Sequence, residues 1–134
     1  MSSSTKNSKT QNQELSAPIA SKTQVGRNYE SRAAEYLMGQ GYELLATNFT
    51  VHRVGEIDLI MKRGLELVFV EVKRRASSQF GGAAVSITPA KQRKLRSAAA
   101  AYLAQHGHLS QHFCRFDAVL FDGDQNPQWI KGAF

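Results

Sequence analysis

Two carboxylates and a lysine in the stretch from Gly55 to Arg75 are placed where they could act together on a bound cation. Apolar and polar residues alternate on both sides of Gly64, and this pattern predicts two antiparallel strands joined by a tight turn. In the register that the turn sets, Asp58 faces Glu71 with their Cβ atoms about 5 Å apart. Carboxylates this close repel each other unless a cation lies between them, and Mg²⁺ prefers such oxygen ligands. Lys73 follows Glu71 on the same face and can reach the same place.

The same register predicts one apolar face and one charged face for this hairpin. The expected pairs are Ile57–Val72, Leu59–Val70 and Met61–Val68 on the apolar face, with Glu56–Lys73 beside Asp58–Glu71 on the other. The alternative is an ordinary charged face in contact with water. Two features favour the metal site: Asp is depleted in strands, and Glu71 ends a run that is apolar on both faces, as in a buried strand. A carboxylate there needs a partner or a metal.

These residues also resemble a known family. Gly-Glu-Ile-Asp-Leu-Ile, a short turn, and then Val-Phe-Val-Glu-Val-Lys-Arg-Arg are similar to the metal-dependent PD-(D/E)xK nuclease superfamily. Within it the match is to the small YraN-type proteins, which are related to archaeal Holliday-junction resolvases. Asp58 takes the place of the first acidic ligand, and Glu71-Val72-Lys73 takes the place of the (D/E)xK element. The match runs from about Gly26 to about Asp122, and Ile57 stands where the superfamily's name has proline.

The resemblance implies a restriction-endonuclease-like fold, an α/β fold with an αβββαβ core in which helices flank a central mixed sheet. The sequence pattern predicts the same order of elements, although alternation of helices and strands alone leaves several α/β and α+β folds open. We expect a helix over 25–40, a strand over 42–50, the hairpin over 55–75, a helix from Thr88-Pro89 to about His106, a strand over 114–121 and an edge strand over 128–131.

Glu30 is the candidate third carboxylate. At helical spacing it shares a face with the small residues Ala33 and Ala34, which should pack against the sheet. An inward Glu on the first helix suits a metal site, and the resemblance implies the same role. The alternative is a surface ion pair between Glu30 and Arg27 or Arg32.

The second predicted helix begins with a cluster of cations. Lys91, Arg93, Lys94 and Arg96 lie in its first two turns, where the helix dipole disfavours each cation of the first turn by about 0.3–1 kcal/mol. A bound polyanion would offset that cost. Lys91 also lies on the apolar stripe, one turn before Leu95, and the resemblance places a Lys or Gln of this helix near the active site. For the other three cations, a solvated basic helix face remains the alternative.

The predicted reaction is hydrolysis of a DNA phosphodiester bond. Asp58, Glu71 and the main-chain carbonyl of Val72 would hold one or two Mg²⁺ (or Mn²⁺) ions, and Glu30 would complete the metal shell. Lys73 would orient the attacking water or stabilise charge that develops on phosphorus.

The expected partner is DNA, and the resemblance implies branched or junction DNA, for which a homodimer would suit. The expected phosphate contacts are Lys91, Arg74, Arg75, Arg93 and Lys94. Two rivals remain: a non-catalytic nucleic-acid-binding module that kept the nuclease fold, and an acidic scaffold for a protein partner.

Composition limits the remaining possibilities. The chain of 134 residues has 17 Lys and Arg against 11 Asp and Glu, a net charge of +6 that favours an anionic partner. Cys114 is the single cysteine, which fits a reducing, cytoplasmic location, and no apolar run predicts a membrane span. We expect a disordered polar tail over 1–24, then a nuclease-like domain over 25–134. His106, His108, His112 and Cys114 follow no recognised zinc spacing.

Overall fold

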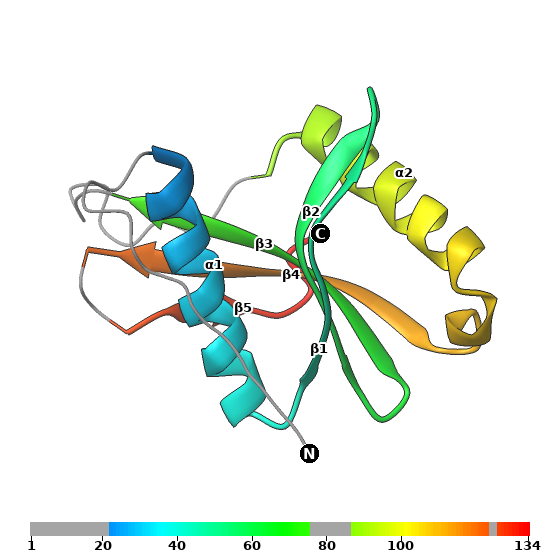
Figure 1. Cartoon of the computed structure of the whole chain (residues 1–134), viewed down its shortest axis with the longest axis horizontal. Helices are drawn as coiled ribbons and strands as arrows, with labels where there is room; N and C mark the ends of the chain where they lie inside the picture. Colours follow the sequence, from blue (N-terminus) through cyan, green and yellow to red (C-terminus); the bar gives the residue numbers. More distant parts are fainter. Residues whose placement is uncertain (1–21, 76–86, 124–125) are drawn as a thin grey trace, which may run out of the picture.

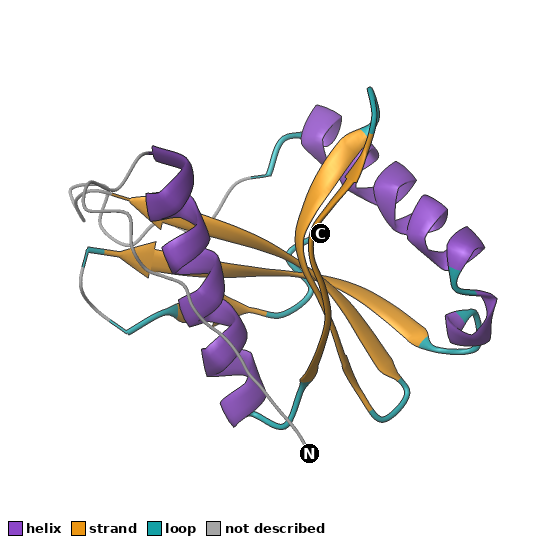
Figure 2. Cartoon of the chain, viewed as in Figure 1, coloured by secondary structure: helices purple, strands orange, loops and turns teal. Residues whose placement is uncertain are grey.

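The computed structural model describes residues 22–75, 87–123 and 126–134. The order of its elements is that of the expected αβββαβ core, followed by an edge strand (Figure 2). The helices and strands are α1 (Lys22–Gly39), β1 (Glu43–Val51), β2 (Gly55–Arg63), β3 (Glu66–Arg75), α2 (Pro89–Gln105), the short 3-10 helix η2 (Gly107–Leu109), β4 (Phe113–Asp122) and β5 (Gln128–Ile130). Within these residues no helix is both long and apolar enough to cross a membrane.

The five strands form one mixed sheet in the order β1-β2-β3-β4-β5. Strands β3 and β4 are parallel, and the other neighbours are antiparallel. Parallel neighbours need a long crossover connection, and α2 lies within it. Figure 1 shows α1 on one side of the twisted sheet and α2 on the other. The expected α/β fold class is confirmed.

Local sequence determines where the helices begin and end. Thr88 is the N-cap of α2, because its hydroxyl accepts the Lys91 N–H at 3.1 Å, and Pro89 is the first helical residue. These are the roles that the Thr-Pro pair predicts. Helix α1 begins at Lys22, three residues before the expected start at Val25. The rest of the predicted tail and the loop over 76–86, with Phe80, lie outside the described residues.

Two hydrophobic clusters fill the layers on either side of the sheet. On the α1 side the buried residues include Ala33, Ala34, Leu37, Leu59, Met61, Val68, Val70, Val119 and Phe121. On the α2 side they include Ile57, Ile60, Leu67, Phe69, Leu95, Ala98, Ala99 and Tyr102. Leu95 lies on the buried stripe of α2, as predicted, and alternate residues of β4 pack on opposite sides of the sheet.

The β2–β3 hairpin confirms the predicted register over its first half only. Gly64 occupies the turn with a φ of 59°, and the pairs run from Arg63–Glu66 to Leu59–Val70. There the ladder ends. The three expected pairs beyond it, Asp58–Glu71, Ile57–Val72 and Glu56–Lys73, are wrong as ladder pairs.

The physical reason is a sharp twist in β2. Ile57 packs on the α2 side, whereas Leu59 packs on the α1 side, although alternate residues of a regular strand share a face. Beyond this twist β2 pairs only with β1 down to Val51–Gly55, and β3 pairs only with β4 up to Arg75–Asp122. The two strands therefore diverge, as Figure 1 shows.

Candidate active site

The candidate site lies where β2 and β3 separate. We call the region around Asp58, Glu71 and Val72 the fork. Where the β2–β3 ladder has ended, a side-chain hydrogen bond still joins the two strands: Oδ2 of Asp58 accepts the main-chain N–H of Val72 at 2.8 Å. A side chain in the role of a backbone acceptor thus spans the opening between the strands, and it holds the Asp58 carboxylate next to the Glu71-Val72-Lys73 segment.

Electrostatics make Asp58 unusual among the acids of this chain. Burial, and then the nearby charges of Glu71, Glu30 and Glu56, raise the pKa of Asp58 to about 7, against the lowering effect of the Val72 N–H. The charges of Glu71 and Glu30 therefore act on Asp58, although Asp58 and Glu71 are not paired across the strands as predicted. A carboxyl group whose pKa is raised by burial and by neighbouring acids is typical of functional sites.

Glu71 is the more deeply buried acid of the fork, with 7% of its surface exposed. Its Oε2 lies 3.5 Å from Nζ of Lys91 on α2. The apolar stripe of α2 placed Lys91 inward and the family resemblance implied a position near the active site; the structure places Lys91 beside Glu71. The ammonium offsets part of the negative charge of the fork, because a buried carboxylate without a partner is costly.

Glu30 is held by a residue that sequence reasoning missed. Asn48 of β1 donates its side-chain N–H to Oε1 of Glu30 at 2.9 Å. Asn48 has a φ of 51°, a left-handed conformation that Asn tolerates better than most residues. Asn is depleted in strands, so an Asn in the middle of a predicted strand was the available clue.

The alternative surface pairing of Glu30 is not what the described residues show. The guanidinium of Arg32 lies 4.8 Å from the ring centroid of Phe121 and 5.1 Å from that of Tyr29. The side chain of Arg27 is outside the described residues. The structure thus shows Glu30 in contact with Asn48 of the sheet, and not with Arg32.

The remaining predicted residues are not all in one place. Lys73 is half-buried in β3, and within the described chain no carboxylate pairs with it. Arg74 is exposed, and its guanidinium lies 5.5 Å from the ring centroid of Tyr29, on the α1 side. Arg93 and Lys94 are exposed on α2, on the opposite side of the sheet. The Arg75 side chain lies outside the described residues.

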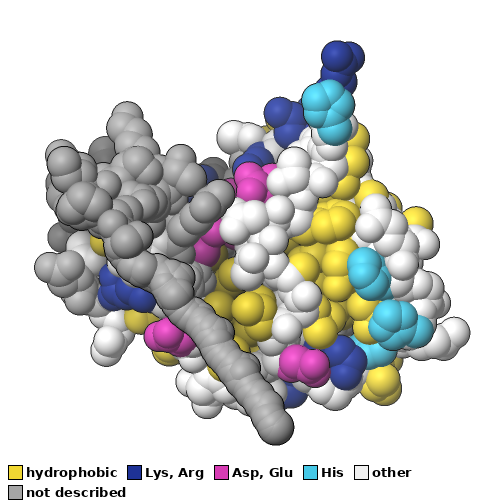
Figure 3. Space-filling view, in the orientation of Figure 1, with side chains coloured by type: hydrophobic (Ala, Val, Ile, Leu, Met, Phe, Trp, Pro, Cys, Tyr) yellow, Lys and Arg dark blue, Asp and Glu magenta, His cyan; other side chains and the backbone are white. Residues whose placement is uncertain are grey.

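Figure 3 shows how charge is distributed on one face. Acidic side chains gather below the tip of the β1–β2 hairpin, and basic and histidine side chains project at the tip itself. Exposed acidic side chains thus lie next to a positive edge on this face. A negatively charged polymer could approach along that edge while a cation offsets the acids.

The oxygens of the fork suit a hard cation, but the arrangement is sparse. Within the described residues, no group of three or more His, Cys, Asp and Glu is placed to hold a metal ion. Mg²⁺ keeps several waters and often uses only one or two carboxylates, so Asp58, Glu71 and the Val72 carbonyl fit its preferences, with Glu30 acting through water. His106 instead stacks on Tyr102 at 4.0 Å, and its Nδ1 lies 2.9 Å from the carbonyl oxygen of Tyr102.

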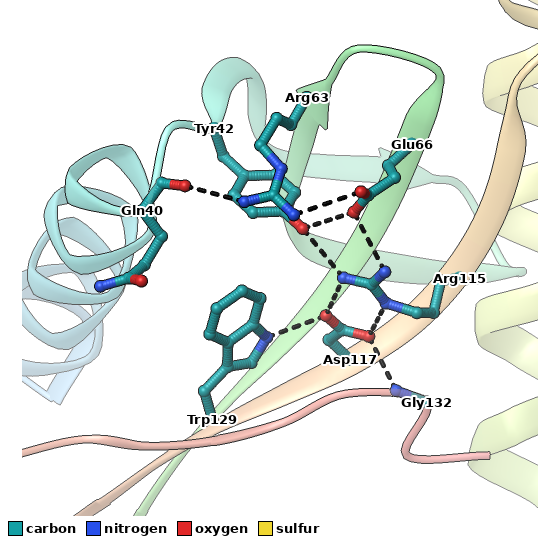
Figure 4. Close-up of polar contacts among 8 residues, drawn as sticks. All are labelled: Gln40, Tyr42, Arg63, Glu66, Arg115, Asp117, Trp129 and Gly132. Carbon is teal, nitrogen blue, oxygen red and sulfur yellow. Dashed lines mark hydrogen bonds and ion pairs between the residues drawn. The ribbon is translucent and has the colours of Figure 1, made fainter.

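A second buried acid belongs to a different kind of cluster. Asp117 of β4 is 1% exposed, and Arg115 donates to both its carboxylate oxygens, at 2.8 and 3.0 Å. The Trp129 indole donates to it at 2.8 Å and the Gly132 main chain at 2.9 Å. Figure 4 shows these donors converging from β4, β5 and the C-terminal segment.

The same arginine extends the cluster to the β2–β3 hairpin. Arg115 donates to Glu66 at 3.1 Å and to the Tyr42 hydroxyl at 3.2 Å, and Arg63 donates to Glu66 at 3.2 Å. The hydrogen bond from Tyr42, and then those from Arg63 and Arg115, lower the pKa of Glu66 to about 2. We call Tyr42, Glu66, Arg115, Asp117, Trp129 and Gly132 the Asp117 cluster. Its polar groups are satisfied internally, which indicates a structural role.

The fold and the fork together define the class: a restriction-endonuclease-like α/β protein. The architecture is similar to the solved structure of Hjc, a Holliday junction resolvase from Archaeoglobus fulgidus. The TM-score is 0.52, and the match covers 79% of this chain and 76% of that chain at 12% sequence identity. At this low sequence identity, the similarity shows a common fold and nothing more.

Sequence comparison then identifies the family. The family model of uncharacterised protein family UPF0102 matches residues 29–121, and the chain belongs to this family. The UPF0102 protein of Alkalilimnicola ehrlichii is 53% identical over 119 residues, covering 89% of this chain and 92% of that protein. The UPF0102 protein YraN of Shigella flexneri is 47% identical over 112 residues, covering 83% and 84%. The YraN-type resemblance is confirmed.

Proposed function

We propose that this protein is a metal-dependent endonuclease that hydrolyses DNA phosphodiester bonds. The observation that supports the proposal most is the pair of acids at the fork, the half-buried Asp58 and the buried Glu71. Burial and Glu71 raise the pKa of Asp58 to about 7, and the main-chain N–H of Val72 is the one donor that lowers it. A cation held between the carboxylates of Asp58 and Glu71 would relieve the repulsion between them.

The cation would be Mg²⁺ or Mn²⁺, held by Asp58, Glu71 and the main-chain carbonyl of Val72, with Glu30 directly or through water. When bound, it would supply a Lewis acid that polarises the phosphate and lowers the pKa of the attacking water. Asn48 would orient Glu30 towards this shell. The hydrogen bond from Val72 would keep the Asp58 carboxylate in the fork.

The lysines of the site would act on the phosphate and the water. Lys73, on the segment that carries Glu71, would orient the water or stabilise charge developing on phosphorus. Lys91 would hold Glu71 in place and contact a phosphate oxygen. Arg74, Arg75, Arg93 and Lys94 would bind flanking phosphates, so that affinity falls steeply with salt.

Branched or junction DNA is the proposed substrate class. The solved structure with the similar fold is described as a Holliday junction resolvase, and the described residues show no base-reading element. A homodimer would present two forks to the two arms of such a substrate. Recognition would then depend on DNA shape and on phosphates.

The test is cleavage of labelled four-way-junction, flap, single-stranded and linear duplex DNA with Mg²⁺, with Mn²⁺ or with EDTA. We expect metal-dependent cutting that Asp58→Asn reduces at least about 100-fold. Glu43→Gln is the matched control, because it neutralises an exposed acid of β1 outside the fork and should leave cutting unchanged. Equal cutting by the wild-type and Asp58→Asn proteins would contradict the proposal.

A non-catalytic nucleic-acid-binding module is the second candidate. It is favoured by the ion pair between Lys91 and Glu71, and by the lack of a three-residue metal-ligand group within the described residues. This candidate predicts salt-sensitive DNA binding without cleavage of any substrate in either metal. It also predicts that EDTA leaves the DNA affinity unchanged.

A further inference from the structure

A groove runs between the β1–β2 turn and the first half of α2, on the α2 side of the fork. Two adjoining hollows share Arg53, Val54 and Lys94 as lining residues. One of them continues to Glu56, two residues before Asp58. The other continues along α2 past Ala90, Arg93 and Ser97. The hollows form one continuous groove, which begins beside the fork.

A glycine allows the two walls of the groove to approach each other. A Cβ atom at Gly55 would lie 3.1 Å from both the Cβ and the carbonyl oxygen of Lys94, closer than most real contacts. The turn before it is closed by the Val54 N–H, which donates to the Val51 carbonyl at 2.9 Å. Arg53 takes a φ of 64° in this turn. The hairpin tip is thus fixed against α2, and Arg53 is brought to the cations of the helix.

The groove carries more positive than negative charge: three of its lining residues are cations, and Glu56 at one end is the acidic lining residue among the described residues. Arg53, Arg93 and Lys94 are exposed, and within the described residues none of them forms an ion pair with a carboxylate. Elsewhere in the fold, Arg63 and Arg115 are paired with Glu66. Three cations on two elements that are packed together repel each other, and an anion in the groove would remove that repulsion.

We infer that this groove binds the sugar-phosphate backbone of duplex DNA next to the phosphate at the fork. The inference rests on the proposed function and specifies the path of the substrate. Lys91 and Lys94 are three residues apart on α2, a spacing that puts their Cβ atoms about 5–6 Å apart. Lys91 lies at Glu71 in the fork, and Lys94 lines the groove. The backbone therefore leaves the fork along α2, over Arg53 and Arg93.

Salt-dependent binding tests this inference without requiring cleavage. The Arg53→Gln/Lys94→Gln variant and the wild type are titrated against a fluorescent duplex in EDTA at several salt concentrations. Each lost phosphate contact should flatten the plot of log K against log salt by about 0.9. We expect the slope to fall by about 1.8 in magnitude, with circular dichroism and thermal unfolding showing that the variant is folded.

The matched control removes the same charge elsewhere. In Lys62→Gln/Lys131→Gln, one substituted lysine lines a different hollow and the other lies over the Trp129 ring. We expect this control to keep the wild-type slope. The same reduction in both variants, an unchanged slope in the groove variant, or a wild-type protein that binds no duplex would each overturn the inference.

The cleavage test separates this inference from the proposed function. If no substrate is cut but only the groove variant shows a reduced slope of log K against log salt, the groove inference is supported and the nuclease proposal fails. If the wild type cuts DNA but the groove variant keeps its slope, the nuclease proposal stands and the groove inference fails.

Discussion

Asp58 and Asp117 are both enclosed acids of the same sheet, but their surroundings are opposite. Asp117 accepts four hydrogen bonds, two of them from the Arg115 guanidinium. Among the described residues Asp58 accepts one hydrogen bond, from the Val72 main chain, and the nearby acids raise its pKa. The Asp117 cluster is complete without any ligand. In the fork, Lys91 offsets part of the negative charge, and the acids around Asp58 still raise its pKa.

The contrast shows how to separate a structural acid from a candidate site acid. Burial alone does not distinguish them, because Asp117 is the more buried of the two. The two acids differ instead in the number and the charge of the hydrogen-bond donors around them. Fully satisfied polar networks stiffen a fold, whereas uncompensated acids cost stability, which a functional site tolerates.

The largest expected effect on stability is at Asp117. We expect Asp117→Ala to lower the free energy of unfolding by about 3 kcal/mol, because it leaves Arg115, the Trp129 indole and the Gly132 N–H without their acceptor. Urea denaturation followed by circular dichroism measures the change. Glu43→Ala, an exposed acid of β1, is the control and should stay within about 0.5 kcal/mol. A loss at Asp117 no larger than the control's would break the comparison.

At Asp58 we expect a substitution to raise the free energy of unfolding, by an amount that depends on pH. Its folded pKa of about 7 lies above the unfolded value of about 3.9, so the native state binds the extra proton. The protonated Asp58 contributes stability that is fully present below about pH 4 and is lost as pH rises through 7. The total loss is about 1.4 kcal/mol for each unit by which the folded and unfolded pKa values differ. Asp58→Asn keeps an acceptor for the Val72 N–H and removes this loss.

Thermal unfolding at pH 5 and pH 8 measures this effect. Without divalent metal, we expect the advantage of Asp58→Asn over the wild type to grow by about 2 kcal/mol between the two pH values. Added Mg²⁺ should stabilise the wild type at pH 8 and reduce the difference, because a ligand that binds the native state stabilises it. Parallel pH profiles for the two proteins would show that Asp58 resembles Asp117 after all.

The smallest effect is expected at Asn48, which holds Glu30 beside the fork. Asn48→Gly keeps a residue that adopts positive φ easily and removes the hydrogen bond to Glu30. We expect affinity for Mn²⁺ to fall about 10-fold, a typical loss when a group that orients a metal ligand is removed. Isothermal titration calorimetry measures it, with Thr47→Ala as the neighbouring control. Unchanged Mn²⁺ affinity in Asn48→Gly would exclude this positioning role.

Sequence reasoning succeeded where the determinants were local. The Gly64 turn and the Thr88-Pro89 helix start involve neighbours along the chain, and the structure confirms both. The alternation on either side of the turn is confirmed as far as the Leu59–Val70 pair. The helix stripe predicted that Lys91 lies inward, but its ion pair with Glu71 was not predicted. The resemblance added the order of the elements, which alternation alone left open.

The tertiary structure decided how each acid is compensated. The β2–β3 ladder ends at Leu59–Val70 because β2 is drawn to β1 and β3 to β4, and alternation within one hairpin carries no information about those competing strands. Asn48 reaches Glu30 from another element, and Arg53 meets Lys94 only because Gly55 lets the hairpin tip approach α2. The sequence by itself therefore determined the fold and the identity of the fork acids. Only the packing of distant segments decided that Asp117 is surrounded by hydrogen-bond donors and Asp58 by other acids, since burial and charge depend on neighbours in space.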